Sequence, residues 1–295
     1  MKYSVDFGGS TIDVISWKGK NIYSKRSYER HPRFSSAGIS DFFAENRGDF
    51  ADASRFFITG GRVRRAPAKI LGVPVVKVPE IQAIARGGLH LLKTLLRSRS
   101  RGKPSRRPAL KKVLVVSMGT GTCLVTIENR PGNGSRKEKL FFRHVGGTGV
   151  GGGTFLGLAS ALLNQKDPAK LLKMFERGKT SKVDVSVKDI VGSGIGIVPG
   201  TATASNLAKL SREISFSKDD LAAGIVNLVG QTIGILAVFA AKAYGCDAIL
   251  LTGKLTRVQK ILSAVKEAGR LYKVVMLVPK DAAYVSALGA FDFQS

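Results

Sequence analysis

The sequence has few cysteines, few acidic residues and no long hydrophobic run. Its two cysteines, Cys123 and Cys246, lie far apart among 295 residues. Two thiols by themselves do not complete a metal site, and so low a cysteine content is typical of a reduced, cytoplasmic protein. No apolar run approaches the roughly 18 residues that a membrane-spanning helix needs. The first residues turn polar at Asp6, so we expect neither a membrane segment nor a secretory signal peptide.

The shortage of acidic residues leaves a strongly basic chain. Lys and Arg total 47 against 21 Asp and Glu, which gives a net charge of +26. Such a charge favours anionic partners: nucleic acid, an acidic membrane surface or phosphorylated metabolites. The densest basic stretch, residues 97–112, contains no acid and no aromatic residue that could stack a base. We interpret it as a solvated linker between two lobes and expect no nucleic-acid partner, a nucleic-acid-binding arm being the alternative.

A strand–glycine turn–strand module occurs twice in the chain. The first copy turns at residues 8–11 and the second at residues 119–122, and each is followed by a third strand and by helices. Backbone N–H groups in such turns point into a common space, and glycine lets a phosphate approach closely. The duplication predicts an α/β protein with two lobes, residues 1–105 and 106–295, that hold phosphates between them.

Hydrophobic periodicity predicts the other elements. The expected strands are at residues 2–7, 12–17, 21–28, 55–59, 73–78, 112–117, 123–129, 139–145, 248–252 and 273–278. The expected helices are at residues 80–96, 154–164, 168–177, 201–212, 218–244 and 281–291, with one more between the last two strands.

Two common nucleotide-binding motifs fit poorly. Residues 178–180 supply the Gly-Lys-Thr ending of a P-loop, but position 173 is Lys where that motif needs Gly. Residues 147–152 match the Gly-x-Gly-x-x-Gly of a dinucleotide-binding fold. That fold also needs an acid at the end of a second parallel strand, whereas the residues around Asp167 have helical spacing.

A third pattern fits every element. It requires an Asp-x-Gly-Gly-Ser hairpin, a second Gly-Thr-Gly hairpin and a late strand that ends in Thr-Gly. These stand at residues 6–10, 119–122 and 250–253, in that order. The order and spacing predict a two-lobed actin-like (ribonuclease H-like) ATPase fold with a duplicated β-hairpin–strand–helix module.

One long glycine block and several short ones carry a family resemblance. The long block, residues 143–158, is Arg-His-Val-Gly-Gly-Thr-Gly-Val-Gly-Gly-Gly-Thr-Phe-Leu-Gly-Leu. The short blocks are residues 58–61, 78–88, 187–192, 203–206 and 286–290. In this order they resemble the type II (eukaryotic-like) pantothenate kinases over nearly the whole chain. The resemblance implies phosphorylation of the primary hydroxyl of pantothenate with ATP and Mg²⁺, the first step toward coenzyme A. It also implies a homodimer and, as a regulator, coenzyme A or an acyl-CoA.

The resemblance also assigns roles to residues. Glu80 matches the general base, and a carboxylate in the first turn of a helix is kept ionised by the helix dipole. Asp6 matches the acid that holds Mg²⁺. The residues matched to ATP binding are Asp6, Gly8, Gly9, Ser10, Thr11, Thr120, Gly121, Thr122, Gly151, Gly152, Gly153, Thr154 and Gly253. Those matched to the substrate are Arg143, His144, Gly147, Thr148 and Gly149.

Two positions depart from the family pattern. The family has Lys where this chain has Asp13, and Arg where it has His144. Arg143 stands one step earlier, which on a strand turns its side chain to the opposite face. An unpaired acid near a triphosphate costs on the order of 1 kcal/mol or more. We therefore expect Asp13 to pair with an arginine such as Arg62 or Arg65, the alternative being a second carboxylate for Mg²⁺. Another actin-like small-molecule kinase, or a weakly catalytic relative that binds nucleotide or coenzyme A, stays open as an alternative function.

Overall fold

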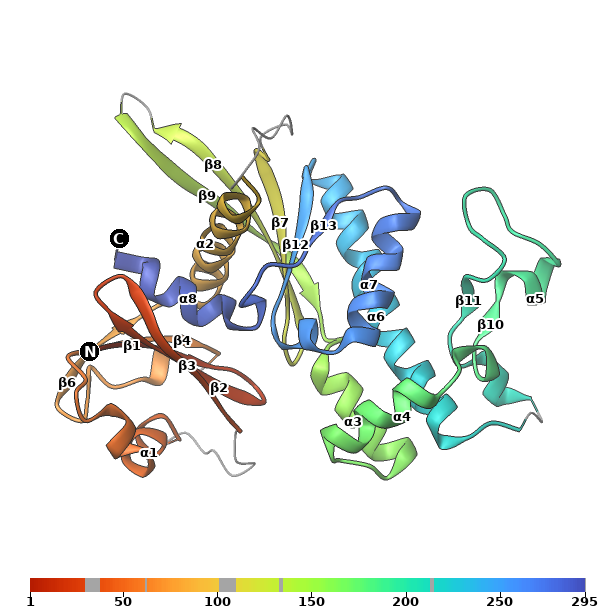
Figure 1. Cartoon of the computed structure of the whole chain (residues 1–295), viewed down its shortest axis with the longest axis horizontal. Coiled ribbons are helices and arrows are strands. Elements are labelled where there is room, and N and C mark those ends of the chain that lie inside the picture. Colours follow the sequence, from red (N-terminus) through yellow and green to blue (C-terminus); the bar gives the residue numbers. More distant parts are fainter. Residues whose placement is uncertain (30–37, 62, 101–109, 133–134, 213–214, 295) are drawn as a thin grey trace.

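Two mixed β-sheets form two lobes, and the helices α2 (Glu80–Ser100) and α8 (Val285–Phe291) lie between them (Figure 1). The computed structural model describes residues 1–29, 38–61, 63–100, 110–132, 135–212 and 215–294. Across the first sheet the strands are β3 (Asn21–Glu29), β2 (Thr11–Lys18), β1 (Lys2–Phe7), β4 (Arg55–Gly60), β6 (Val73–Lys77) and β5 (Lys69–Ile70). Across the second they are β13 (Met276–Leu277), β12 (Ala248–Thr252), β7 (Lys112–Met118), β8 (Thr122–Gly132) and β9 (Ser135–Thr148).

The two sheets share one topology. β1 pairs antiparallel with β2 and parallel with β4. In the same way, β7 pairs antiparallel with β8 and parallel with β12. The central strands are almost wholly buried, as expected where helices cover both faces of parallel strands. The predicted α/β fold with a duplicated module is confirmed. The expected boundary between residues 105 and 106 lies outside the described residues.

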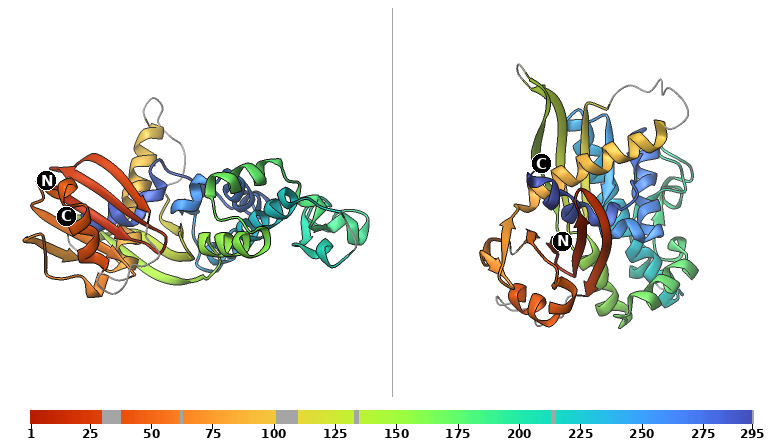
Figure 2. Two further views of the ribbon diagram at one scale, coloured as in Figure 1. Left: turned by 90° about the horizontal axis from the view of Figure 1, so that it is seen from below. Right: turned by 60° about the vertical axis from the view of Figure 1, so that its left-hand side comes forward.

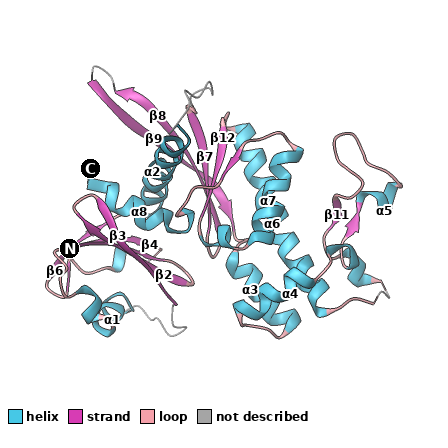
Figure 3. Cartoon of the chain, viewed as in Figure 1, coloured by secondary structure: helices cyan, strands magenta, loops and turns pink. Residues whose placement is uncertain are grey.

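Helices cover both faces of the second sheet (Figure 3). In the described part of the chain the α-helices are α1 (Gly38–Glu45), α2 (Glu80–Ser100), α3 (Gly152–Leu163), α4 (Pro168–Arg177), α5 (Val187–Val191), α6 (Lys218–Ala243), α7 (Gln259–Leu271) and α8 (Val285–Phe291). Side chains of β7 alternate between two cores. Leu114 and Val116 pack with α6 and α7, whereas Val113 and Val115 pack with α2 and α8. α8 also contacts β1 and β4, so the end of the chain returns to the first lobe.

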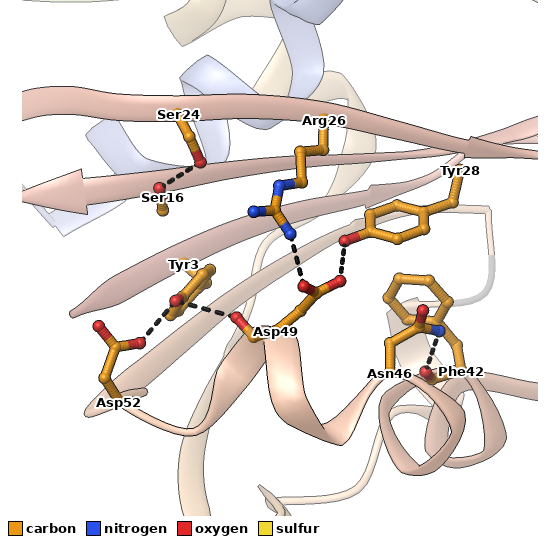
Figure 4. Close-up of polar contacts among 9 residues, drawn as sticks. All are labelled: Tyr3, Ser16, Ser24, Arg26, Tyr28, Phe42, Asn46, Asp49 and Asp52. Carbon is orange, nitrogen blue, oxygen red and sulfur yellow. Dashed lines mark hydrogen bonds and ion pairs between the residues drawn. The ribbon is translucent and has the colours of Figure 1, made fainter.

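An aromatic core and a polar cluster hold α1 and the following 3₁₀ turn, Arg47–Phe50, on the first sheet. Phe42 and Phe43 of α1 pack with Phe7 and other aromatic side chains of this lobe. In Figure 4 the carboxylate of Asp49 accepts hydrogen bonds from Arg26 at 2.5 Å and from the Tyr28 hydroxyl at 2.6 Å. Hydrophobic periodicity did not predict α1, because a helix of only eight residues shows little more than two turns of periodicity.

The helix expected at residues 201–212 is wrong. The segment holds the short strand β11 (Thr203–Ser205) and a 3₁₀ turn. Leu207 has a left-handed backbone (φ +60°), and its N–H donates to buried Asp184 at 2.8 Å. The amide of Asn227 joins Asp184 at 2.7 Å to Thr203 at 3.1 Å. These tertiary hydrogen bonds replace the helical ones.

β11, its partner β10 (Val185–Ser186) and α5 form an arm at the far end of the second lobe (Figure 2). The strand expected at residues 273–278 is shortened to β13, because the turn that follows α7 includes Lys273, whose φ of 56° is incompatible with a strand. α2 runs past residue 96, so the basic stretch begins inside this helix. Residues 101–109 of that stretch lie outside the described residues.

Among the described helices, α6 alone is long and apolar enough to cross a membrane by length and composition. Two-thirds of its most apolar window, 67%, is buried inside the fold. Its side chains, such as Ile225, Val229 and Ile233, are buried in one core with side chains of the second sheet and α7. This burial is typical of the core helix of a globular protein.

Candidate active site

A cavity of about 500 Å³ lies between the lobes, where the two hairpin turns face each other. The predicted residues that line it are Asp6, Gly8, Gly9, Ser10, Thr11, Glu80, Thr120, Gly121, Thr122, Thr148, Gly152 and Gly253. The predicted residues outside its lining are Arg143, His144, Gly147, Gly149, Gly151, Gly153 and Thr154. The structure therefore gathers most of the predicted nucleotide residues in one place and leaves most of the predicted substrate residues outside it.

The two turns touch across the cavity. The hydroxyls of Ser10 and Thr120 lie 3.2 Å apart, within hydrogen-bond distance. A Cβ added at Gly9 would lie 2.3 Å from the Thr120 hydroxyl, so any larger residue would have to displace the Thr120 side chain. Glycine at this position brings two backbone turns and two hydroxyls within reach of one bound group.

The loop before α3 supports the second turn. The N–H groups of Gly152 and Gly153 donate to the carbonyls of Gly119 and Thr120, each at 2.8 Å. A Cβ at Gly151 would lie 2.5 Å from the Thr120 carbonyl oxygen. The amides at the start of α3 thus hold the second turn in shape. Of the loop residues 151–154, only Gly152 lines the cavity.

Thr154 acts within that loop. Its hydroxyl donates to the Gly149 carbonyl at 2.9 Å and accepts from the Gly151 N–H at 3.3 Å. The hydroxyl therefore closes the glycine loop on itself at the start of α3, as an N-terminal capping interaction does.

Three carboxylates line the cavity: Asp6, Asp13 and Glu80. Asp6 stands directly opposite Asp13 in the register of β1 and β2, so both side chains share one face of the sheet. Burial is the main cause that raises the pKa of Asp6 to about 7, and the charges of Asp13 and Glu80 add to it. A hydrogen bond from Ser286 acts in the opposite direction. A Cβ at Gly60 would lie 2.9 Å from a carboxylate oxygen of Asp6, so glycine makes room for this carboxylate.

Glu80 is the first residue of α2, as predicted, and lines the cavity. We expected the helix dipole to keep it ionised. Partial burial acts in the opposite direction and raises the pKa of Glu80 above its usual value. A carboxylate with a raised pKa is a stronger proton acceptor, which suits a general base.

Among the described residues Asp13 pairs with a lysine and not with Arg65, whereas Arg62, the other arginine expected as a partner, lies outside the described residues. Its carboxylate contacts the ammonium group of Lys254 and accepts a hydrogen bond from the Ser27 hydroxyl at 2.6 Å. The ammonium group also lies 4.9 Å from the centre of the Tyr284 ring. Lys254 directly follows the Thr-Gly turn of β12. This position was the one feature of the sequence that could have indicated Lys254 as a site residue.

The predicted substrate residues are divided. Thr148 lines the cavity. Arg143 and His144 are exposed on the edge strand β9, and the guanidinium of Arg143 lies 5.5 Å from the centre of the Tyr244 ring. Gly147 packs on β8, where an added Cβ would lie 2.3 Å from the Thr122 carbonyl oxygen.

Some lining residues were not predicted as site residues. They are Ile84, Ser117, Cys123, Phe155, Leu156, Pro168, Lys254, Leu255, Val258, Ala283, Val285 and Ser286. The apolar members of this group look like ordinary core residues in the sequence and carry no chemical signal of their own. Their place in the fold makes them part of the site.

Two lobes of one topology, with glycine turns facing each other across a cavity, define the class of actin-like ATPases. The fold is shared with a ROK family glucokinase from Streptomyces griseus in complex with glucose and AMPPNP. That match has a TM-score of 0.57 at 14% identity and covers 99% of this chain and 98% of that one. The ADPNP-bound activator of the 2-hydroxyisocaproyl-CoA dehydratase from Clostridium difficile matches with a TM-score of 0.55 at 16% identity, over 98% and 92% of the two chains.

The family model named Fumble matches residues 24–292, so the chain belongs to the Fumble family, that of the type II pantothenate kinases. A type II pantothenate kinase from Oceanobacillus iheyensis is 28% identical over 256 residues, which are 85% of this chain and 83% of the relative. A type II pantothenate kinase from Bacillus cereus is 24% identical over 269 residues, which are 89% and 88% of the two chains. The family resemblance found in the sequence is thereby confirmed.

Proposed function

We propose that this protein transfers the terminal phosphoryl group of ATP to the primary hydroxyl of pantothenate, giving 4'-phosphopantothenate. The observation that carries the proposal is the placement of Glu80 in the same cavity as the two glycine hairpin turns. Phosphoryl transfer asks a protein for positioning, for neutralisation of phosphate charge and for a group that takes the proton of the acceptor. The family relatives named type II pantothenate kinase support pantothenate as that acceptor.

The residues of the cavity divide between these tasks. The turns at residues 8–11 and 119–122 would hold the phosphates through backbone N–H groups and hydroxyls. Glu80 would accept the proton of the attacking hydroxyl. The apolar side chains of Phe155, Leu255 and Val258, which line the same cavity, would pack against the nucleoside next to Gly253.

Asp6 fits a magnesium ion. Its carboxylate oxygens line the cavity; burial raises the pKa of this group, the charges of Asp13 and Glu80 add to the effect, and a bound divalent cation would act in the opposite direction. Mg²⁺ prefers one or two carboxylates together with phosphate oxygens and water. When bound, the ion would neutralise phosphate charge.

The test of this function is the variant Glu80→Gln. We expect its affinity for ATP to stay close to wild type and kcat to fall by roughly 10²-fold or more, as loss of a general base does. ADP release should be measured with pantothenate, pantetheine and simple sugars as acceptors, and ATP binding by calorimetry. Glu176→Gln, at an exposed position on α4, is the matched control.

The outcomes separate the alternatives. Unchanged turnover in Glu80→Gln would remove this residue from the mechanism. Turnover by the wild type with a sugar but not with pantothenate would assign another small-molecule kinase activity. Binding of ATP or coenzyme A without turnover of any acceptor would indicate a non-catalytic relative.

The proposal includes four finer features. The protein works in the cytoplasm as a homodimer, and coenzyme A or an acyl-CoA regulates it. On the acceptor side we assign Thr148, which lines the cavity, and Arg143, His144, Gly147 and Gly149 of β9 and the following loop, which do not line it. The exposed apolar residues of the arm support the dimer.

A further inference from the structure

The charge of the cavity is unusual for a site that binds a triphosphate. Three carboxylates line it, Asp6, Asp13 and Glu80. Among the described residues, Lys254 is the one cationic side chain in the lining. A nucleotide triphosphate would add several more negative charges to this group. A triphosphate bound here would therefore find its cationic partner among the described lining residues in Lys254.

Lys254 is anchored from both lobes. It follows Gly253, whose φ of +88° and close approach to the Met118 carbonyl leave no room for a Cβ. From this turn its ammonium group reaches across the cavity to Asp13 on β2. It also lies 2.6 Å from the hydroxyl of Ser27 on β3. The turn at Gly253 thus directs the lysine side chain across the cavity, and contacts from the opposite lobe hold its ammonium group.

The anchored ammonium group lies beside the place where phosphates are expected. Asp13 shares its face of the sheet with Asp6, and directly opposite residues on such a pair of strands have Cβ atoms about 5 Å apart. Ser10 and Thr11 of the first turn line the same cavity. Two carboxylates opposite each other would repel an incoming phosphate without a cation between them. The lysine supplies that cation in a compact form with three N–H donors.

We propose that Lys254 is a phosphate-binding residue for the nucleotide, and that Asp13 holds it in place across the cleft. The positive charge that the family pattern places on the second strand has here moved to the opposite lobe, and an acid on the second strand positions it. This inference rests on the proposed binding of ATP in this cavity. Asp13 is the positioning residue and Lys254 the residue that touches the phosphates.

The experiment measures binding of MgATP, MgADP and adenosine to the full-length protein by calorimetry. Lys254→Gln should weaken MgATP binding by about tenfold to hundredfold, the effect of losing a charge-assisted hydrogen bond. Adenosine binding should stay unchanged, and MgADP should lie between. Adding Asp13→Lys to this variant should restore most of the lost MgATP affinity, because a lysine then stands on the second strand instead.

A matched control distinguishes phosphate binding from a purely structural role of an ion pair between the two lobes. Lys25 on β3 forms a second ion pair between the lobes, with Asp281 at 2.5 Å, and does not line the cavity. Lys25→Gln should therefore leave the affinity for all three ligands as in wild type. Circular dichroism and thermal unfolding check each variant. If Lys254→Gln does not fold, Asp13→Asn with Lys254→Gln removes both charges together and carries the same expectation.

Each outcome decides the inference. Wild-type MgATP affinity in folded Lys254→Gln would overturn it. So would an equal loss for adenosine and MgATP, or an equal loss in Lys25→Gln, since both would show a structural role only. Failure of the wild type to bind MgATP at all would instead contradict the proposed function.

Discussion

Asp6 is the residue whose charge depends most strongly on the fold. Burial is the main reason that its pKa rises to about 7, and the neighbouring charges of Asp13 and Glu80 add to the effect. Lys254 and a hydrogen bond from Ser286 act in the opposite direction. In the ligand-free protein a proton therefore stays on Asp6 over a pH range in which an exposed aspartate has lost it.

This shift predicts a pH dependence of stability. The unfolded chain releases the Asp6 proton near pH 4, whereas the folded chain keeps it to about pH 7. Because the folded state binds more protons in this window, the contribution of Asp6 to the free energy of unfolding falls as pH rises from about 4 to 7. Asp6→Asn should flatten this profile and be more stable than wild type at pH 8, on the order of 2 kcal/mol.

The measurement is urea unfolding at pH 5 and pH 8 without ATP or Mg²⁺. Asp41→Asn, at an exposed position on α1, should keep the wild-type profile. Parallel profiles for wild type and Asp6→Asn would show that the cavity does not raise the pKa of this carboxyl group.

At the scale of elements, the crossing of α2 and α8 positions the candidate base. Gly87 and Gly289 lie where the two helices meet. A Cβ at Gly87 would stand 1.8 Å from the Val285 carbonyl oxygen, and one at Gly289 1.8 Å from the Ala83 carbonyl oxygen. α2 begins at Glu80, and α8 also contacts the first sheet. The two glycines therefore let the backbones approach closely and set the position of Glu80 relative to the first lobe.

Gly289→Ala should consequently reduce both stability and activity. The added methyl group meets backbone rather than a movable side chain, so we expect a loss of about 3 kcal/mol or more in the free energy of unfolding. We also expect kcat to fall, because the start of α2, and with it Glu80, shifts. Thermal unfolding and ADP release measure the two effects.

Gly157→Ala on α3 is the matched control, because nothing lies within 4 Å of the added Cβ. It should be neutral or stabilise the protein by up to about 1 kcal/mol, since alanine favours a helix over glycine. Equal effects of the two substitutions would show that the helix crossing has room for a methyl group.

At the scale of the whole molecule, the arm carries apolar side chains that are exposed among the residues that the structure describes. Four of its residues are between 47% and 66% exposed: Ile190, Val191, Ile195 and Ile197. Grouped exposed apolar side chains on a globular protein mark interaction surfaces. The net charge of +26 opposes association of two copies, so a dimer would need such an apolar contact.

We therefore expect the proposed homodimer to depend on this arm. Sedimentation equilibrium at micromolar concentration should show a dimer for the wild type and a monomer for Ile195→Asp combined with Ile197→Asp. Leu162→Asp changes a residue on α3 that is 50% exposed, and it should leave the dimer intact. A monomeric wild type, or a dimer unaffected by the arm substitutions, would contradict this expectation.

Local patterns in the sequence determined much of the fold and part of the site. The start of α4 follows from Asp167, which accepts hydrogen bonds from two backbone N–H groups, and from Pro168 at the first helical position. The duplicated hairpins were predicted because a glycine turn between two apolar strands is a local feature. Most of the residues matched to ATP binding came with them and line the cavity.

Tertiary structure alone decided the rest. Leu207 takes a left-handed backbone because Asp184, from another segment, binds its N–H. Asp13 pairs with Lys254 although 241 residues separate them, where the sequence suggested a nearby arginine. Likewise, α8 returns from the end of the chain to cover the first sheet. Periodicity and turn motifs depend on neighbours along the chain, whereas the partner of a buried charge depends on which distant segments the packing brings together.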